Sequence, residues 1–151
     1  MLIYFLIALL IILADLGTKA LIVANLSLGN SIEATSFFNI VYVLNKGVSF
    51  SMLSDVGPFI LTALSVLICL SVVYFMFKEK DTLSRTALAL ILGGAIGNII
   101  DRIRYGAVVD FLDFHAFGYH WPAFNVADSA ICIGVMLLLY QMIFIKKEKQ
   151  K

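Results

Sequence analysis

Four apolar runs, each about as long as a bilayer crossing, constrain what this chain can fold into. They cover approximately residues 2–24, 58–77, 86–101 and 126–145. A hydrocarbon core about 30 Å thick needs about 20 helical residues per crossing, and 62% of the chain is hydrophobic while only 14% is charged. The sequence therefore predicts an all-α membrane protein, a four-transmembrane-helix bundle that forms a single domain over residues 1–151.

The runs differ in how they begin and in which small residues they contain. The second begins at Pro58, which suits the first helical position because proline lacks the N–H that would be unpaired there. The third contains Gly93 and Gly97, a four-residue spacing typical of close helix packing. The first follows Met1-Leu2 without the basic residues of a removable signal peptide, so we expect it to remain as a span.

Lysine and arginine residues are distributed unequally between the two ends of the predicted bundle. Positive residues near span ends are retained on the cytoplasmic side of a membrane. We therefore expect both termini to be cytoplasmic and the loops at about 25–57 and 101–124 to face outward. The end that carries both termini has Lys78, Lys80, Arg85, Lys146, Lys147, Lys149 and Lys151, whereas the other end has Lys46, Arg102 and Arg104.

Both outer loops are rich in aromatic residues. In the first, aromatic and β-branched residues flank Asn45-Lys46-Gly47, which predicts a small extracytoplasmic β-hairpin or cradle with its turn there. Aromatic side chains favour the headgroup level of a bilayer, so the second is expected to be a loop or helix at the interface. Its aromatic residues are Phe111, Phe114, Phe117, Tyr119, Trp121 and Phe124.

Acidic side chains in or beside the apolar runs are candidate functional residues. A charge in hydrocarbon costs about 2.5–3.5 kcal/mol on insertion scales, so it is seldom present without a role. At 1.5 Å per helical residue, Asp15 lies about 20 Å along the first span from Leu2, in the outer half of the bilayer. We expect the polar residues at this depth to gather together: Asp15, Lys19, Asn98, Asp101, Arg102, Asp110, Asn125 and Asp128.

Some of these residues also have a purely structural explanation. Asp15 and Lys19 are spaced i,i+4, which favours an ion pair within one helix. Asp101 is expected to cap the third helix or to pair with Arg102 where that helix ends. The structural role is favoured for all of these positions, with substrate contact as the alternative for Asp15 and Lys19.

Residues around the fourth run pose the same choice. Asn125, three positions before Asp128, has the pattern of an N-terminal helix cap, and the helix dipole favours the later acid. Asp110 is harder to explain in this way, because its sequence neighbours are apolar and offer no counter-charge. Asp113 is expected to be solvated.

The remaining polar and sulfur-containing residues indicate no metal, cofactor or nucleic acid. His115 and His120 lack the spacing of metal ligands and are expected at the surface. Cys69 and Cys132 lie inside uncharged runs, where a free cysteine behaves as a small hydrophobe. The net charge of +1 excludes an extended basic surface for nucleic acid.

Two other classes of membrane protein also place polar residues inside a bundle. A small proton-linked transporter or channel does so, but it needs a polar path across the membrane. Here the acids cluster near one face. A noncatalytic lipid-binding scaffold would fit the amphipathic loops, but it would leave Asp110 in an apolar setting unexplained.

Over nearly its whole length the sequence resembles the lipoprotein signal peptidase (signal peptidase II) family. The resemblance is carried by five blocks that occur in order in a four-span chain, and each alone would be a weak signal. They are Asp15-Leu16-Gly17-Thr18-Lys19, Asn45-Lys46-Gly47-Val48-Ser49-Phe50, Gly93 through Arg102, Val108-Val109-Asp110-Phe111, and Phe124-Asn125-Val126-Ala127-Asp128.

The resemblance implies a membrane aspartic peptidase without a cofactor, in which Asp110 and Asp128 are the catalytic acids. Its substrates would be diacylglyceryl-prolipoproteins, cut before the lipidated cysteine, and its surroundings membrane phospholipid. We expect a monomer in the bacterial cytoplasmic (inner) membrane with its active site near the outer face. The resemblance assigns site-supporting or substrate-facing positions to Asp15, Lys19, Asn45, Asn98, Asp101, Arg102 and Asn125.

Overall fold

Four long helices make up most of the protein in the computed structural model, which describes residues 1–47 and 57–145. All four are long and apolar enough to cross a bilayer, so the predicted fold class is confirmed. They are α1 (Leu2–Asn25), α2 (Pro58–Lys78), α3 (Thr82–Tyr105) and α4 (Val126–Tyr140), and a π-helical turn, η3 (Gln141–Ile145), continues the last of them.

Helix α3 is the central helix of the bundle. Of its most apolar stretch 61% is buried inside the protein, against 17–22% for the other three helices. Small residues allow the close approach: a Cβ on Gly93 would lie 2.7 Å from the carbonyl oxygen of Ala8 in α1, and one on Gly94 would overlap that of Ala127 in α4. The predicted packing role of the glycine-rich segment is therefore confirmed.

The ends of α3 extend beyond the expected span of 86–101. The helix begins at Thr82 because the Asp81 side chain accepts a hydrogen bond of 2.8 Å from the backbone N–H of Ser84 and so caps it. It ends at Tyr105, where Gly106 adopts a left-handed conformation with φ 67°. Hydropathy locates the membrane-spanning part, whereas capping decides where the helix begins and ends.

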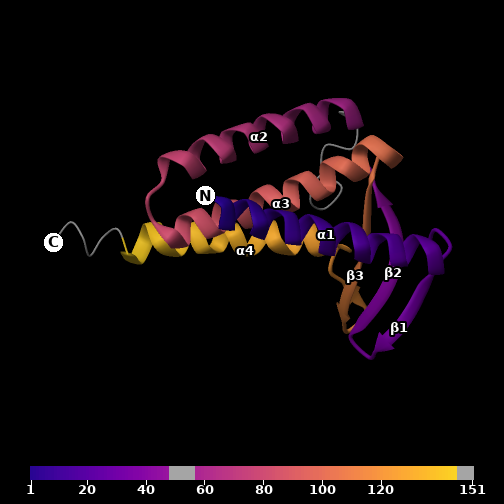
Figure 1. Ribbon diagram of the computed structural model, residues 1–151. Helices are drawn as coiled ribbons and strands as arrows, with labels where there is room; N and C mark the ends of the chain where they lie inside the picture. The colour runs from indigo at the N-terminus through magenta and orange to yellow at the C-terminus, as the bar shows by residue number, and fades with distance from the viewer. Residues whose placement is uncertain (48–56, 146–151) are drawn as a thin grey trace.

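A small antiparallel sheet lies at the end of the bundle opposite the N-terminus and the α2–α3 connection (Figure 1). Its strands are ordered β1-β2-β3-β4, so both edges of β2 and of β3 are paired within the sheet. The pairing of β2 with β3 therefore connects the segment between α1 and α2 to the segment between α3 and α4. The strands are β1 (Ser31–Thr35), β2 (Phe38–Asn45), β3 (Val108–Ala116) and β4 (Tyr119–His120).

One local expectation about the outer segments is wrong, and another falls outside the described residues. A hairpin turn joins β1 to β2, and β2 also pairs with β3. The hairpin expected at Asn45-Lys46-Gly47 has its second strand at 48–52, which lies outside the described residues. The second outer segment is neither loop nor helix over residues 108–116, since its backbone pairs with β2.

We predict that Gly94→Ala destabilises the bundle by about 1–3 kcal/mol, because the new methyl group overlaps the backbone of α4 and overpacks the contact. Thermal unfolding in detergent measures the effect. Gly17→Ala is the matched control, since no atom lies within 4 Å of a Cβ at that position. Equal unfolding temperatures for the two variants would contradict the close α3–α4 contact.

Candidate active site

A buried ammonium group, that of Lys19, lies at the centre of the polar network between the helices and the sheet. Its Nζ is 2.7 Å from Asp15 Oδ2 and 2.9 Å from Asp101 Oδ2, and it donates a hydrogen bond of 3.0 Å to Asn98 Oδ1. Only 2% of Lys19 is exposed. The i,i+4 ion pair is present, but Asp101 pairs with this lysine across the helix interface and not with Arg102 as expected.

The two carboxylates that bind Lys19 also hold the backbone of neighbouring elements. Asp15 Oδ1 accepts a hydrogen bond of 2.9 Å from the N–H of Ala127 in the first turn of α4. Asp101 Oδ2 accepts one of 3.0 Å from the N–H of Val109 in β3. Asp128 directly follows Ala127, and Asp110 directly follows Val109. The two backbone hydrogen bonds therefore fix the chain next to each acid.

Asn125 contacts both of the acids that the family resemblance singles out. Its Nδ2 donates a hydrogen bond of 2.7 Å to Asp110 Oδ1. Its Oδ1 accepts one of 2.9 Å from the N–H of Asp128, and its own N–H donates to Asp128 Oδ2 at 3.3 Å, which completes a capping box at the start of α4. The predicted cap is thus present, and the same residue that caps the helix also holds the second acid.

Two further amides each donate to one of the acids. Asn98 Nδ2 donates to Asp128 Oδ1 at 2.8 Å, while its Oδ1 accepts from Lys19. Asn45, at the end of β2, donates from Nδ2 to Asp110 Oδ2 at 2.9 Å. Each acid therefore receives an amide N–H from a separate element, and the orientation of both carboxyls is fixed.

Asp110 is almost completely buried, with 2% of its surface exposed. Burial and, after it, the nearby charge of Asp128 raise the pKa of Asp110 from its ordinary value of 3.8 to about 7, although the hydrogen bonds from Asn45 and Asn125 act in the opposite direction. Asn125 hydrogen-bonds to both carboxyls and so holds them on either side of one residue. At neutral pH the pair is therefore able to hold a single shared proton.

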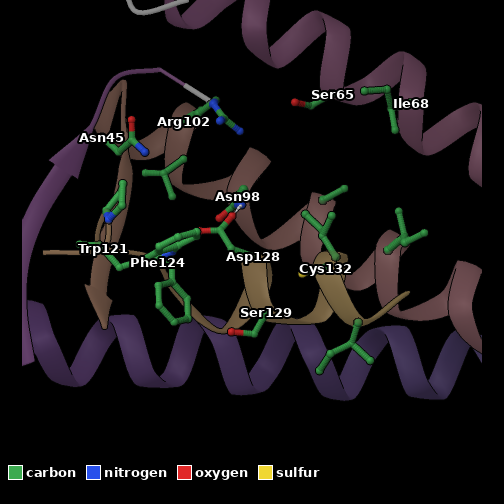
Figure 2. A pocket seen from close by; sticks show the side chains of 17 residues that line it. Asn45, Ser65, Ile68, Asn98, Arg102, Trp121, Phe124, Asp128, Ser129 and Cys132 are labelled. Atoms are coloured by element: carbon green, nitrogen blue, oxygen red, sulfur yellow. Dashed lines mark hydrogen bonds between the residues drawn. The ribbon is translucent and has the colours of Figure 1, made fainter. Parts of the chain in front are cut away.

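A cavity of about 660 Å³ opens beside this pair. Asp128 and Asn98 point toward one another at its wall, and Arg102 lies at its upper edge in the view of Figure 2. The guanidinium of Arg102 donates a hydrogen bond of 3.1 Å to the carbonyl oxygen of Gly47. Asp128 is among the residues that line the cavity and Asp110 is not, so the two acids differ in their access to it.

All of the site residues expected from the sequence lie in this network or line its cavity. Asp113 was expected to be solvated, and this is wrong: only 7% of it is exposed. Burial alone would raise the pKa of Asp113, but hydrogen bonds from Asn39 and His120, together with the electrostatic effect of His120 and His115, leave that pKa below its ordinary value. Both partners come from other strands, so spacing along the chain gave no signal for them.

Comparison with known proteins gives consistent matches over almost the full length. The sequence model of the family described as Signal peptidase (SPase) II matches residues 7–144. The lipoprotein signal peptidase of Syntrophotalea carbinolica is 51% identical over 142 residues, which cover 90% of this chain and 88% of that protein. The lipoprotein signal peptidase of Francisella tularensis subsp. novicida is 43% identical over 151 residues, covering 96% and 94% respectively.

Solved structures share the fold as well. A bacterial membrane enzyme determined by the in meso method at 2.3 Å resolution is similar with a TM-score of 0.86 and 35% sequence identity. The match covers 98% of this chain and 90% of that one. A second such structure, at 1.9 Å resolution, has a TM-score of 0.83 at 35% identity and covers 93% and 92%.

We predict that Lys19→Met destabilises the protein by about 3–5 kcal/mol, because it leaves the buried carboxylates of Asp15 and Asp101 without their counter-charge. Thermal unfolding in detergent measures the loss. Arg104→Met, which removes a positive charge from an exposed position of α3, is the control and should unfold like the wild type. A Lys19→Met protein as stable as this control would show that the ion cluster contributes little.

Proposed function

Because the chain belongs to the signal peptidase II family, it is a protease that removes signal peptides from prolipoproteins, and we propose that Asp110 and Asp128 are its catalytic carboxyls. The proposal makes the enzyme an aspartic peptidase that needs no cofactor. Family membership sets aside the transporter and scaffold alternatives. Hydrolysis by such a pair requires one carboxyl to act as an acid and the other to act as a base.

The observation that carries the assignment is the double contact made by Asn125. One residue with 0% exposure holds Asp110 through its side chain and Asp128 through its backbone and its side-chain oxygen. Two carboxyls held in this way cannot both ionise easily, so one retains a proton while the other is charged. This is the arrangement that aspartic proteases use to activate water.

Asp110 holds the proton at rest and Asp128 is the base. Asp110 is buried, with 2% of its surface exposed, whereas Asp128 is only partly buried. Asp128 lies at the N-terminus of α4, where the helix dipole favours a negative charge, and it faces the cavity that admits water. The unequal surroundings of the two acids thus supply both members of an acid–base pair.

Hydrolysis then proceeds in two steps. Asp128 takes a proton from a water molecule as its oxygen bonds to the scissile carbonyl carbon, and Asp110 donates its proton to the carbonyl oxygen. In the second step the carbon–nitrogen bond breaks. The leaving amine takes the proton that Asp128 had acquired, and the hydroxyl proton of the intermediate returns to Asp110, so the pair regains its starting state.

The other site residues position these two carboxyls and the substrate. Asn45, Asn98 and Asn125 fix the carboxyl orientations through the amide hydrogen bonds described above. Arg102 lines the cavity and binds the carbonyl of Gly47, which places its guanidinium where a substrate backbone carbonyl would also lie. Asp15, Lys19 and Asp101 act at a distance from the substrate by holding this frame.

The lining of the cavity supports a lipid-modified substrate. One part of its wall is apolar and is formed by side chains of α2, α3 and α4, including Ile68, Ile91 and Ile131. These helices cross the hydrocarbon layer, so an acyl chain attached to the substrate would stay in an apolar environment while the peptide reaches Asp128. We therefore propose that cleavage occurs before a diacylglyceryl-modified cysteine.

We also propose a membrane orientation and an assembly state. The protein is a multi-pass bacterial membrane protein. In Figure 1 the N-terminus, the last described turn η3 and the α2–α3 connection lie at one end of the bundle, and the sheet lies at the other. The excess of lysine and arginine at the first end supports cytoplasmic termini, with the active site near the outer face of the cytoplasmic membrane. We propose that the chain acts as one peptidase domain and as a monomer surrounded by phospholipid.

Replacing either catalytic carboxyl should abolish cleavage. We predict that Asp110→Asn and Asp128→Asn each lower the rate by about 10²-fold or more, because an amide neither accepts nor donates the shared proton. Purified enzyme is incubated with a lipidated prolipoprotein, and the released signal peptide is quantified. Glu33→Gln, at an exposed position of β1, is the matched control and should retain the wild-type rate. A dyad variant that cuts at that rate would refute the assignment.

The pH dependence follows from the raised pKa of Asp110. Its proton is lost as the pH rises through about 7, so kcat/KM should fall above that value. Activity should also fall in acid, where Asp128 becomes protonated and no longer acts as a base. Initial rates between pH 4 and 9, on a substrate without groups titrating in this range, measure the profile. A constant kcat/KM across that interval is incompatible with the shared proton.

A further inference from the structure

A second polar cluster, outside the proposed catalytic network, joins strand β3 to the short strand β4. His120 Nδ1 lies 2.9 Å from both carboxylate oxygens of Asp113. Asn39 of β2 donates a hydrogen bond of 2.9 Å to the same carboxylate, and the ring of His115 stacks on that of His120 with centroids 4.9 Å apart. A buried acid at this position, three residues after Asp110, has no part in the mechanism above.

The segment directly after His120 forms a wall of the cavity. Trp121, Pro122, Ala123 and Phe124 are all lining residues, whereas neither Asp113 nor His120 is among them. At its far end the segment is fastened by Phe124, whose N–H donates to the carbonyl of Leu112 at 3.1 Å. The position of the wall therefore also depends on how the chain is held at its other end, next to His120.

Within the described residues, the backbone contacts at the end next to His120 are those of a short strand. Strand β4 has only two residues, Tyr119 and His120, and pairs with β3 at two positions. The N–H of Trp121 donates to the carbonyl of Phe114 at 2.8 Å, but Pro122 has no N–H to donate. The side-chain bond between His120 and Asp113 adds to the attachment at the point where the wall begins.

We propose that Asp113 and His120 are positioning residues that fix the 121–124 wall and thereby set the affinity of the enzyme for its prolipoprotein substrate. The proposal rests on the proposed function, because it takes the cavity beside Asp128 as the substrate site. It assigns these residues no proton transfer. Their loss should therefore weaken substrate binding and leave the chemical step unchanged.

The test separates KM from kcat. We expect His120→Ala to raise KM about tenfold, the loss of one hydrogen bond to a charged group, while kcat stays within about twofold of the wild type. His120→Asn should restore the wild-type KM, because its amide nitrogen can donate to Asp113 from nearly the same position as Nδ1. Tyr119→Ala, on the same strand and 83% exposed, is the matched control.

Each alternative outcome has a separate meaning. An unchanged KM for His120→Ala, with Asp128→Asn inactive, overturns the positioning role and leaves the active site intact. A fall in kcat equal to the rise in KM also overturns it, since the wall would then act on catalysis. If His120→Ala unfolds in detergent, His120→Phe carries the same prediction, because it keeps an aromatic ring beside His115 but has no nitrogen to donate to Asp113. Activity in Asp128→Asn would instead overturn the proposed function.

Discussion

The burial of Lys19 is the constraint on which the rest of the site depends. An ammonium group removed from water is tolerated only when its three donors find acceptors, and here these are Asp15, Asp101 and Asn98. The first two also bind the backbone where α4 and β3 begin. A single cation thus joins three helices and the sheet, and it does so at the depth where hydrolysis is proposed.

The same network gives the side chains of Asp110 and Asp128 different surroundings. Asn98 turns its oxygen toward the ammonium group, so only its nitrogen remains for Asp128. Asn125 likewise turns its nitrogen toward Asp110 because its oxygen accepts from the helix backbone. Neither amide can reverse without losing a buried hydrogen bond. The unequal burial of the two acids then follows from where these amides hold them.

The sequence was informative wherever a residue conflicted with its surroundings. Charged and amide side chains in hydrocarbon, and an Asn three positions before Asp128, predict both the location of the site and its helix cap. Contacts between distant segments were not predictable in this way. The partner of Asp101 is Lys19, 82 positions away, and β2 pairs with β3, which follows α3 in the chain. Strand register depends on the folded bundle and on no local spacing.

The capping box at the start of α4 also bears on the order in which the proposed site is assembled. Asn125 and Asp128 both belong to the last of the four spans. Asp110 precedes α4 in the chain, and its amide partner Asn125 and the proposed second acid come with α4. The proposed catalytic pair is therefore complete only once α4 has joined the other three helices.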